Sequence, residues 1–163
     1  MAGKSSQLQV RISPEQKETL RRLARRAGQD MSTYVLSRAL PETRLRFLRL
    51  LESLRDEERP SYVLAELNDL LSSLTASELQ RAVEQADLRG LTPYLQNYVA
   101  AMVEQAAHHY RVSPPAWVYD VEPLETPHFV TPLKSLRLHL LRAAPVPFKR
   151  RNIFIDSSIG DRV

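Results

Sequence analysis

The sequence predicts a mainly α-helical protein that is built in three parts. Apolar residues recur at helical spacing over most of residues 14–111, with recognisable start and stop residues between the helices. Seven of the eleven prolines lie between Pro114 and Pro147, a density that prevents a continuous helix. We therefore expect an N-terminal domain over residues 1–41, a small helical bundle over 42–111, and a partly extended segment rich in proline and aromatic residues over 112–163.

The chain begins with a segment that alternates between apolar and polar side chains, as a two-faced β-strand does. The apolar positions are Leu8, Val10 and Ile12, and the polar ones are Gln7, Gln9 and Arg11. Polar side chains two residues apart, backed by an apolar face, are typical of a β-ribbon that reads base edges in the DNA major groove. Because one short strand is not stable alone, we expect a second copy of the chain to pair with it.

Two helices are predicted to follow this strand directly. Ser13 is a good N-cap, Pro14 suits the first helical position, and Gly28 is expected to end the helix. Asp30 is expected to cap a second helix, which Pro41 bounds. The predicted order is therefore strand, helix, glycine turn and helix.

This order resembles the ribbon-helix-helix superfamily, the MetJ/Arc/CopG-type regulators and antitoxins. The resemblance covers residues 7–40 and is carried by the alternating strand and two short motifs. These motifs are Ser13-Pro14-Glu15 and Gly28-Gln29-Asp30-Met31-Ser32-Thr33-Tyr34-Val35.

The resemblance implies a homodimer whose two strands pair antiparallel and enter the major groove of operator DNA. The base contacts that it implies come from Gln7, Gln9 and Arg11. Backbone amides around Met31 and Ser32 would hold a phosphate at the N-terminus of the second helix. Asp30 stands where the family usually has Ser or Thr, and its negative charge opposes such a phosphate contact.

The distribution of charge supports a polyanionic partner for the N-terminal part. Residues 1–55 carry a net charge of +7, residues 56–131 carry −8, and residues 132–163 carry +5. A basic block favours nucleic acid because it neutralises phosphates and releases counterions, whereas an acidic block is repelled. The side chains expected to contact phosphates are Lys4, Arg21, Arg22, Arg25 and Arg26. The alternative is that these arginines form a merely solvated helix face.

Four helices are predicted for the bundle. The first two cover about residues 42–56 and 61–73, and the others begin after Thr75 and Thr92. Thr75 and Glu78 form a capping-box pair, and Pro93 suits a first helical position. Short connections between these helices favour antiparallel neighbours.

The C-terminal segment holds the single tryptophan and several other aromatic residues, which a disordered linker usually lacks. We expect a short helix around residues 133–143, a terminal strand over 152–155, and a segment that covers another surface. From Trp117 to Phe154 the segment is similar to C-terminal regions of antitoxins that are paired with nucleotidyltransferase-like toxins. The residues expected to bind the partner are Trp117, Phe129, Phe148, Arg150, Arg151 and Phe154. The alternative is a segment that folds back on its own bundle.

Residues for catalysis or metal binding are sparse. Glu104 and His108 stand four residues apart on a predicted helix, but no third ligand follows at a recognisable spacing. The four glycines are too scattered for a phosphate-binding loop, and no nucleophile, base and orienting group can be placed together. We therefore expect no enzyme activity, no metal and no cofactor.

The absence of cysteine, of a signal-like N-terminus and of a membrane-length apolar run favours a cytoplasmic protein. A DNA-binding module of the predicted kind does not need the rest of the chain to bind an operator. We therefore expect the rest of the chain to have a second task. The main hypothesis is an antitoxin that represses its own operon and neutralises a toxin encoded nearby. The alternatives are a regulator without a toxin and a helical protein–protein adaptor.

Overall fold

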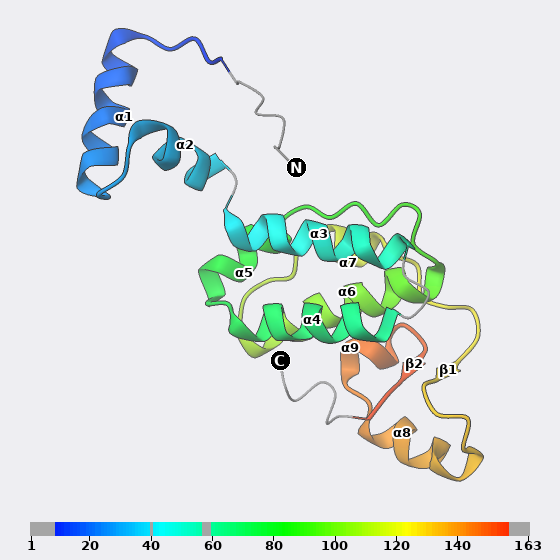
Figure 1. Ribbon diagram of the computed structural model, residues 1–163. Helices are drawn as coiled ribbons and strands as arrows, with labels where there is room; N and C mark the ends of the chain where they lie inside the picture. Colours follow the sequence, from blue (N-terminus) through cyan, green and yellow to red (C-terminus); the bar gives the residue numbers. More distant parts are fainter. Residues whose placement is uncertain (1–8, 40, 57–59, 157–163) are drawn as a thin grey trace. The chain divides into compact units, whose positions relative to one another are not determined.

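The chain divides into two compact units, Met1–Pro41 and Glu42–Val163 (Figure 1). The structure is a computed structural model that describes residues 9–39, 41–56 and 60–156. Each unit is considered by itself below. No helix in the described part of the chain is both long and apolar enough to cross a membrane.

The first helix of the N-terminal unit, α1 (Pro14–Arg26), begins and ends where the sequence predicts. The Gln16 amide donates to Ser13 Oγ at 3.2 Å, and the Ser13 amide donates to Gln16 Oε1 at 2.9 Å, which closes a capping box. At the other end Gly28 has φ +65°, a left-handed conformation that glycine adopts without strain. This turn lets the Gln29 amide reach back to the Ala24 carbonyl at 3.0 Å.

The second helix, α2 (Met31–Ala39), is capped by Asp30 as predicted. The amides of Ser32 and Thr33 donate to Asp30 Oδ1 at 2.9 and 3.0 Å, and the Thr33 hydroxyl donates to Oδ2. These hydrogen bonds, the one from the Thr33 hydroxyl first, lower the pKa of the Asp30 carboxyl below its ordinary value.

The predicted N-terminal strand is wrong for the part of it that the structure describes, and the predicted ribbon-helix-helix fold class is corrected accordingly. Residues 9–13 form no strand, and residues 7 and 8 lie outside the described part. The side chains of Val10 and Ile12 are 66% and 40% exposed, so the described residues of this unit leave the apolar side of the alternation largely uncovered. A segment of this length is not stable as a β-strand unless a neighbouring strand pairs with its backbone N–H and C=O groups.

The larger unit is a helical bundle built around α6 (Pro93–His109). Helix α3 (Glu42–Asp56) packs against both α4 (Pro60–Ser73) and α5 (Ala76–Val83), and α4 and α5 each contact α6. Most residues of α6 are buried, on all of its sides, which is the pattern of a helix that lies in the middle of a core. Helix α6 is therefore the element on which the rest of this unit is assembled.

The N-terminal ends of the bundle helices agree with the sequence. Thr75 and Glu78 form the predicted capping box of α5, with the Thr75 amide donating to Glu78 Oε2 at 2.9 Å. Pro93 opens α6, and Thr92 Oγ1 accepts the Leu95 amide at 3.3 Å. Both caps satisfy backbone groups that a helix end leaves without an internal partner.

The chain after α6 folds back on this bundle (Figure 1). Its elements are α7 (Trp117–Asp120), β1 (His128–Phe129), the 3₁₀ helix η1 (Lys134–Leu136), α8 (Arg137–Ala143), α9 (Val146–Lys149) and β2 (Ile153–Phe154). Helices α7 and α9 contact α6, and Val118, Phe148 and Ile153 belong to the same core as the bundle leucines.

Strands β1 and β2 form the one sheet found in the described residues, and they pair in parallel with His128 opposite Ile153. A second small cluster of Leu140, Ala144 and Phe154, with Phe129 packed against it, anchors α8 beside this sheet. The protein is thus mainly α-helical, as predicted, but its only described strands lie near the C-terminus rather than at the N-terminus.

Candidate functional site

The N-terminal unit presents an exposed set of cationic and amide side chains. Gln9 and Arg11 are exposed in the segment before α1, while Lys4 and Gln7 lie outside the described residues. Arg21 is paired with Glu18 on the same helix, over 3.0 Å. The three other predicted phosphate-contacting side chains are exposed and have no carboxylate partner among the described residues; they are Arg22, Arg25 and Arg26.

The amides at the start of α2 are partly occupied by the chain's own carboxylate. Ser32, one of the two residues expected to hold a phosphate, donates its amide to Asp30. Met31 is half-buried at the first position of α2. A phosphate at this helix end would therefore have to share the site with, or displace, the Asp30 side chain.

The N-terminal unit has almost no core of its own. Ala24 is the one buried side chain among its described residues. Val10, Ile12 and Leu36 are between 40% and 66% exposed. A unit of about 40 residues rarely folds without disulfides, a metal or a second subunit, and this chain has no cysteine. The exposed apolar side chains are therefore what a second subunit could cover.

Five of the six residues expected to bind a partner are used inside the larger unit, the four aromatic residues and Arg151. Trp117 donates Nε1–H to the Val83 carbonyl at 2.8 Å and packs on the core. Phe148 is 2% exposed and meets the Tyr98 ring edge-on, with centroids 5.3 Å apart. Phe154 is 9% exposed and stacks on Phe129, with centroids 4.9 Å apart.

Arg151 and Arg150 share one carboxylate, that of Glu104 on α6. Arg151 Nη2 donates to Glu104 Oε2 at 3.2 Å, and both side chains are almost fully buried. The same guanidinium donates to the carbonyls of Val118 at 2.8 Å and Val121 at 3.3 Å. Arg150, whose side chain is 63% exposed, reaches Glu104 Oε1 at 3.2 Å. Of this pair, Arg150 is thus the arginine that another molecule can reach.

The role of Glu104 escaped the sequence analysis, although a signal for it exists. A single carboxylate stands among Ala100, Ala101, Met102, Val103, Ala106 and Ala107 on α6. A charge in such a run must find a buried counterion. His108, with which Glu104 was considered as a metal-binding pair, is exposed while Glu104 is buried. In the described part of the chain no three His, Asp or Glu side chains are placed to hold a metal ion.

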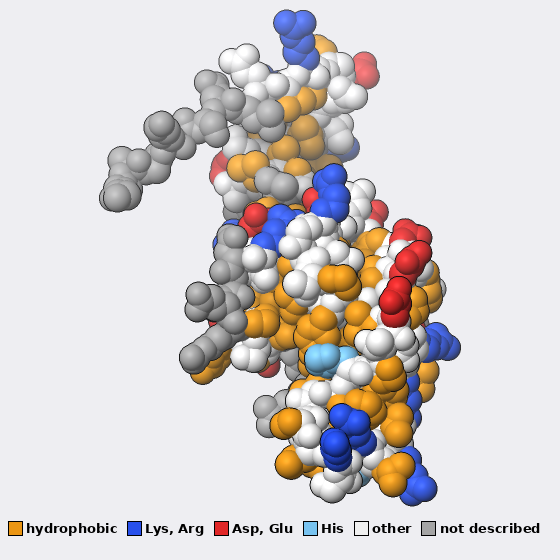
Figure 2. All heavy atoms as spheres, turned by 90° about the vertical axis from the view of Figure 1, so that its right-hand side faces the viewer, with side chains coloured by type: hydrophobic (Ala, Val, Ile, Leu, Met, Phe, Trp, Pro, Cys, Tyr) orange, Lys and Arg blue, Asp and Glu red, His pale blue; other side chains and the backbone are white. Residues whose placement is uncertain are grey.

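Exposed leucines gather on η1 and α8, a surface that the sequence analysis did not single out. We call it the α8 surface and define it by Leu133, Leu136, Leu138 and Leu141, which are 42% to 74% exposed. Lys134, Arg137 and Arg142 are exposed on the same two elements, and residues 130–151 contain no Asp or Glu. The lower part of Figure 2 accordingly shows hydrophobic and cationic side chains without an acidic one on the face in view. The signal in the sequence was five leucines between residues 133 and 141, too many for the single face on which Leu140 is buried.

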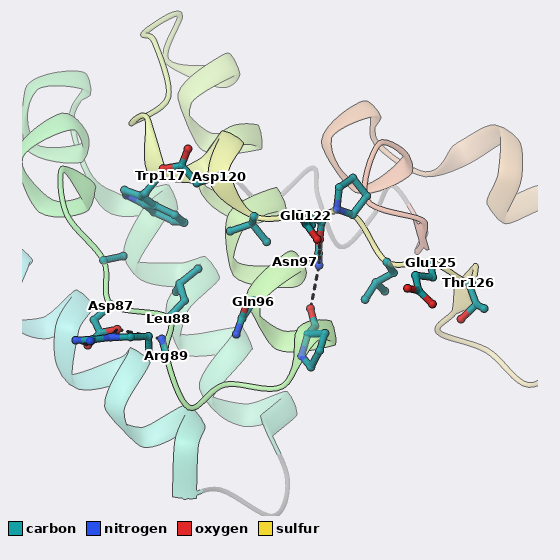
Figure 3. Close-up of a pocket in the computed structure, with 15 residues that line it drawn as sticks. Asp87, Leu88, Arg89, Gln96, Asn97, Trp117, Asp120, Glu122, Glu125 and Thr126 are labelled. Carbon is teal, nitrogen blue, oxygen red and sulfur yellow. Dashed lines mark hydrogen bonds and ion pairs between the residues drawn. The ribbon is translucent and has the colours of Figure 1, made fainter.

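A cleft of about 770 Å³ lies in the larger unit between the connection from α5 to α6, helix α6 itself, and residues 117–126 (Figure 3). Trp117 and the Asp87–Arg89 pair lie toward one end of the cleft, and Glu125 and Thr126 lie toward the other. Asn97 lies between them. None of these residues except Trp117 was predicted to belong to a site.

Charges in the cleft are unevenly paired. Arg89 donates Nε–H and Nη2–H to the two carboxylate oxygens of Asp87, both at 2.9 Å. These hydrogen bonds hold the pKa of the Asp87 carboxyl well below its usual range, so the carboxylate stays ionised and the Arg89 guanidinium offsets its charge. Asp120, Glu122 and Glu125 are exposed, and their carboxylates have no partner among the described residues. The cleft therefore has an excess of negative charge.

The comparisons with known proteins concern the N-terminal part of the chain. Comparison with curated proteins and with solved structures gave no significant match. Residues 7–45 match the model of a protein family described as "Antitoxin TacA 1-like". This range spans α1, α2 and the start of α3, together with the segment before α1, and leaves most of the larger unit uncovered. The N-terminal part of this chain is thus similar to antitoxins.

Proposed function

We propose that this protein is the antitoxin of a toxin–antitoxin pair, which binds operator DNA as a homodimer and neutralises a toxin through its C-terminal half. The observation that carries the proposal is the similarity of residues 7–45 to an antitoxin family. Two exposed surfaces support it: the cations of α1 lie in the N-terminal unit, and the exposed leucines of the α8 surface lie in the larger unit.

DNA binding is assigned to the N-terminal unit. Arg22, Arg25 and Arg26 lie within one turn of α1 and have no carboxylate partner among the described residues, so their charge is available to phosphates. Gln9 and Arg11, with Gln7, are assigned to base edges, because amide and guanidinium groups can form paired hydrogen bonds there. Dimerisation is supported by the poor core of this unit, since a second copy would cover Val10, Ile12 and Leu36.

The experiment that tests DNA binding compares Arg11→Ala with Arg25→Ala in an anisotropy titration on the operator and on random DNA. Arg11→Ala is expected to reduce the preference for the operator by about 1–3 kcal/mol, whereas Arg25→Ala weakens binding to both DNAs alike. Equal losses on both DNAs for Arg11→Ala would overturn the assignment of Arg11. Absence of salt-dependent affinity for any duplex would overturn DNA binding and leave a protein–protein adaptor.

Toxin binding is assigned to the α8 surface together with Arg150, an exposed residue that follows α8 in the sequence. Apolar side chains give affinity when they are buried in a partner, and cations around them select a partner with carboxylates at the rim. In this assignment, four buried or half-buried side chains hold the C-terminal segment in the fold that presents this surface: Trp117, Phe148, Arg151 and Phe154. Phe129 packs under Arg137, whose guanidinium lies 4.9 Å from the ring centroid.

A co-purification experiment tests this assignment. The protein is expressed together with the product of the adjacent gene, and the tagged complex is isolated. The paired substitutions Leu138→Glu and Leu141→Glu are expected to abolish recovery of the partner and the relief of its toxicity. Tyr62→Glu, at a side chain that is 73% exposed on α4, is the matched control and should change neither. A regulator without a toxin would recover no partner in any of these forms.

A further inference from the structure

The cleft beside α6 has a buried polar atom that the fold leaves without a partner. Asn97 is 1% exposed and lines the cleft. Its Nδ2 donates to the carbonyls of Pro93 at 3.0 Å and Glu122 at 2.9 Å. Only the amide nitrogen can donate to two carbonyl oxygens, so the orientation of the side chain is settled. Its Oδ1 is buried and accepts no hydrogen bond from the described residues.

A donor from beyond the described residues would satisfy this acceptor. A buried oxygen without a hydrogen bond costs free energy, which a ligand N–H group placed in the cleft would recover. Figure 3 shows Asn97 and Gln96 between the two ends of the cleft. The Gln96 side chain is already engaged, because its Nε2 donates to the Leu91 carbonyl at 2.9 Å.

Acidic side chains give the rim of the cleft unpaired negative charge. The carboxylates of Asp120, Glu122 and Glu125 are exposed at the cleft and unpaired among the described residues. The one cation of the lining, Arg89, already holds both oxygens of Asp87. A cation entering the cleft would therefore meet three carboxylates that have no partner among the described residues, and one arginine whose charge Asp87 already offsets.

The remaining wall is apolar and aromatic. Leu88, Val121 and Leu124 line the cleft together with Trp117. Such a wall takes the methylene stem of a long side chain, and an indole face attracts a guanidinium or ammonium group. The volume of about 770 Å³ lies within the range of roughly 300–1,000 Å³ that is usual for ligand pockets.

We propose that this cleft is a binding site for a guanidinium or ammonium group on an apolar stem, the chemistry of an arginine or lysine side chain. The ligand N–H groups would donate to Asn97 Oδ1 and to the carboxylates of Glu122 and Glu125. The stem would pack on Leu124 and Trp117. The site belongs to the larger unit alone, and it does not depend on the function proposed above.

The single tryptophan of the chain lines this cleft, so its fluorescence reports occupancy directly. The full chain is titrated with N-acetyl-arginine amide, with the peptide acetyl-Leu-Arg-Leu-amide, and with acetyl-Leu-Glu-Leu-amide as the charge-reversed probe. A saturable change is expected with the two cationic probes and not with the acidic one. Tighter binding of the peptide assigns the site to an arginine within a polypeptide, whereas equal binding assigns it to a small cationic molecule.

Charge-removing variants test whether the bound cation lies beside the carboxylates of Glu122 and Glu125. Glu122→Gln and Glu125→Gln are each expected to weaken the arginine probe by about two- to fivefold, with a smaller difference at high salt. Glu66→Gln, at an exposed carboxylate of α4 outside the cleft, is the matched control and should bind as the unchanged protein does. The same titrations are followed by calorimetry, so that a silent tryptophan does not hide binding. No heat and no fluorescence change at millimolar probe, or equal effects of all three variants, would overturn the proposal.

Discussion

Arg151 donates a hydrogen bond to Glu104 over 3.2 Å and thereby joins two residues that are 47 positions apart in the chain. Glu104 belongs to the central helix α6, and Arg151 lies between α9 and β2. Because the same guanidinium also donates to carbonyls of residues 118 and 121, one side chain ties the C-terminal segment to α6 and to the stretch around α7. This contact joins the buried side chains of Val118, Phe148 and Ile153 in holding the segment after residue 112 on the bundle.

Breaking this ion pair from one side is expected to destabilise the protein strongly. Arg151→Met leaves Glu104 buried with only the exposed Arg150 as its partner, and a loss of about 3–5 kcal/mol in the free energy of unfolding is expected. The double variant Glu104→Leu with Arg151→Met removes both charges and should cost clearly less than the two single losses added together. Denaturant unfolding of the four proteins measures this coupling, and strictly additive losses would contradict it.

Trp117→Phe tests the hydrogen bond between the indole and the Val83 carbonyl. The substitution keeps an aromatic ring but removes the donor at 2.8 Å, which leaves a carbonyl of α5 without that partner. A loss of about 1–3 kcal/mol is expected in urea unfolding followed by circular dichroism. Tyr119→Phe, at a side chain that is 63% exposed on the same helix, should stay within about 0.5 kcal/mol. Equal effects of the two variants would show that the hydrogen bond is not what Trp117 contributes.

Alkaline pH should weaken the fold through Tyr94, a half-buried tyrosine of α6. Burial, with a smaller contribution from Tyr98, raises the pKa of Tyr94 from 10.0 to about 12. The Tyr94 phenol therefore ionises at a lower pH in the unfolded chain than in the folded one. The stability that this group contributes is fully present below pH 10 and is lost as the pH rises toward 12. Tyr94→Phe should flatten this part of the stability curve by an amount on the order of 1–3 kcal/mol. An unchanged slope of the unfolding free energy between pH 10 and 12 would argue against burial of the phenol.

The salt dependence of DNA binding counts the phosphates that α1 contacts. Replacing Arg22, Arg25 and Arg26 together by Gln is expected to reduce the slope of log K against log salt by about 1 for each lost contact. Arg49→Gln, at an exposed arginine of α3 beyond residue 45, is the control with an expected unchanged slope. If the triple variant keeps the original slope, these arginines are a solvated face and the phosphate contacts lie elsewhere.

Local signals in the sequence predicted the local structure well. Ser13, Asp30, Thr75 and Thr92 were expected to start helices, and each lies at the start of one, because a capping side chain acts on amides only two or three residues away. Gly28 was expected to end α1, and it does so in the left-handed conformation that few other residues adopt readily.

Partners distant in the sequence were not predictable in the same way. The alternation around Val10 and Ile12 indicated a strand, but alternation states only which side chains share a face and not whether another strand is there to pair with. The same difficulty applies to the proline-rich C-terminal segment. Its aromatic residues indicated that the segment is buried against another surface, but the sequence left open whether that surface belongs to a partner or to the bundle. The cleft beside α6 likewise combines residues from three separate stretches of the chain.

The sequence by itself determined the helical character of the chain, the positions at which most helices begin, the three charge blocks and the similarity of residues 7–45 to antitoxins. Tertiary structure alone decided that Glu104 receives Arg151, that Phe148 and Trp117 turn inward, and that the leucines of α8 remain exposed. The physical reason is range. Caps and helical periodicity depend on neighbours a few residues away, whereas burial and ion pairing depend on which segments distant in the sequence pack together in the folded chain.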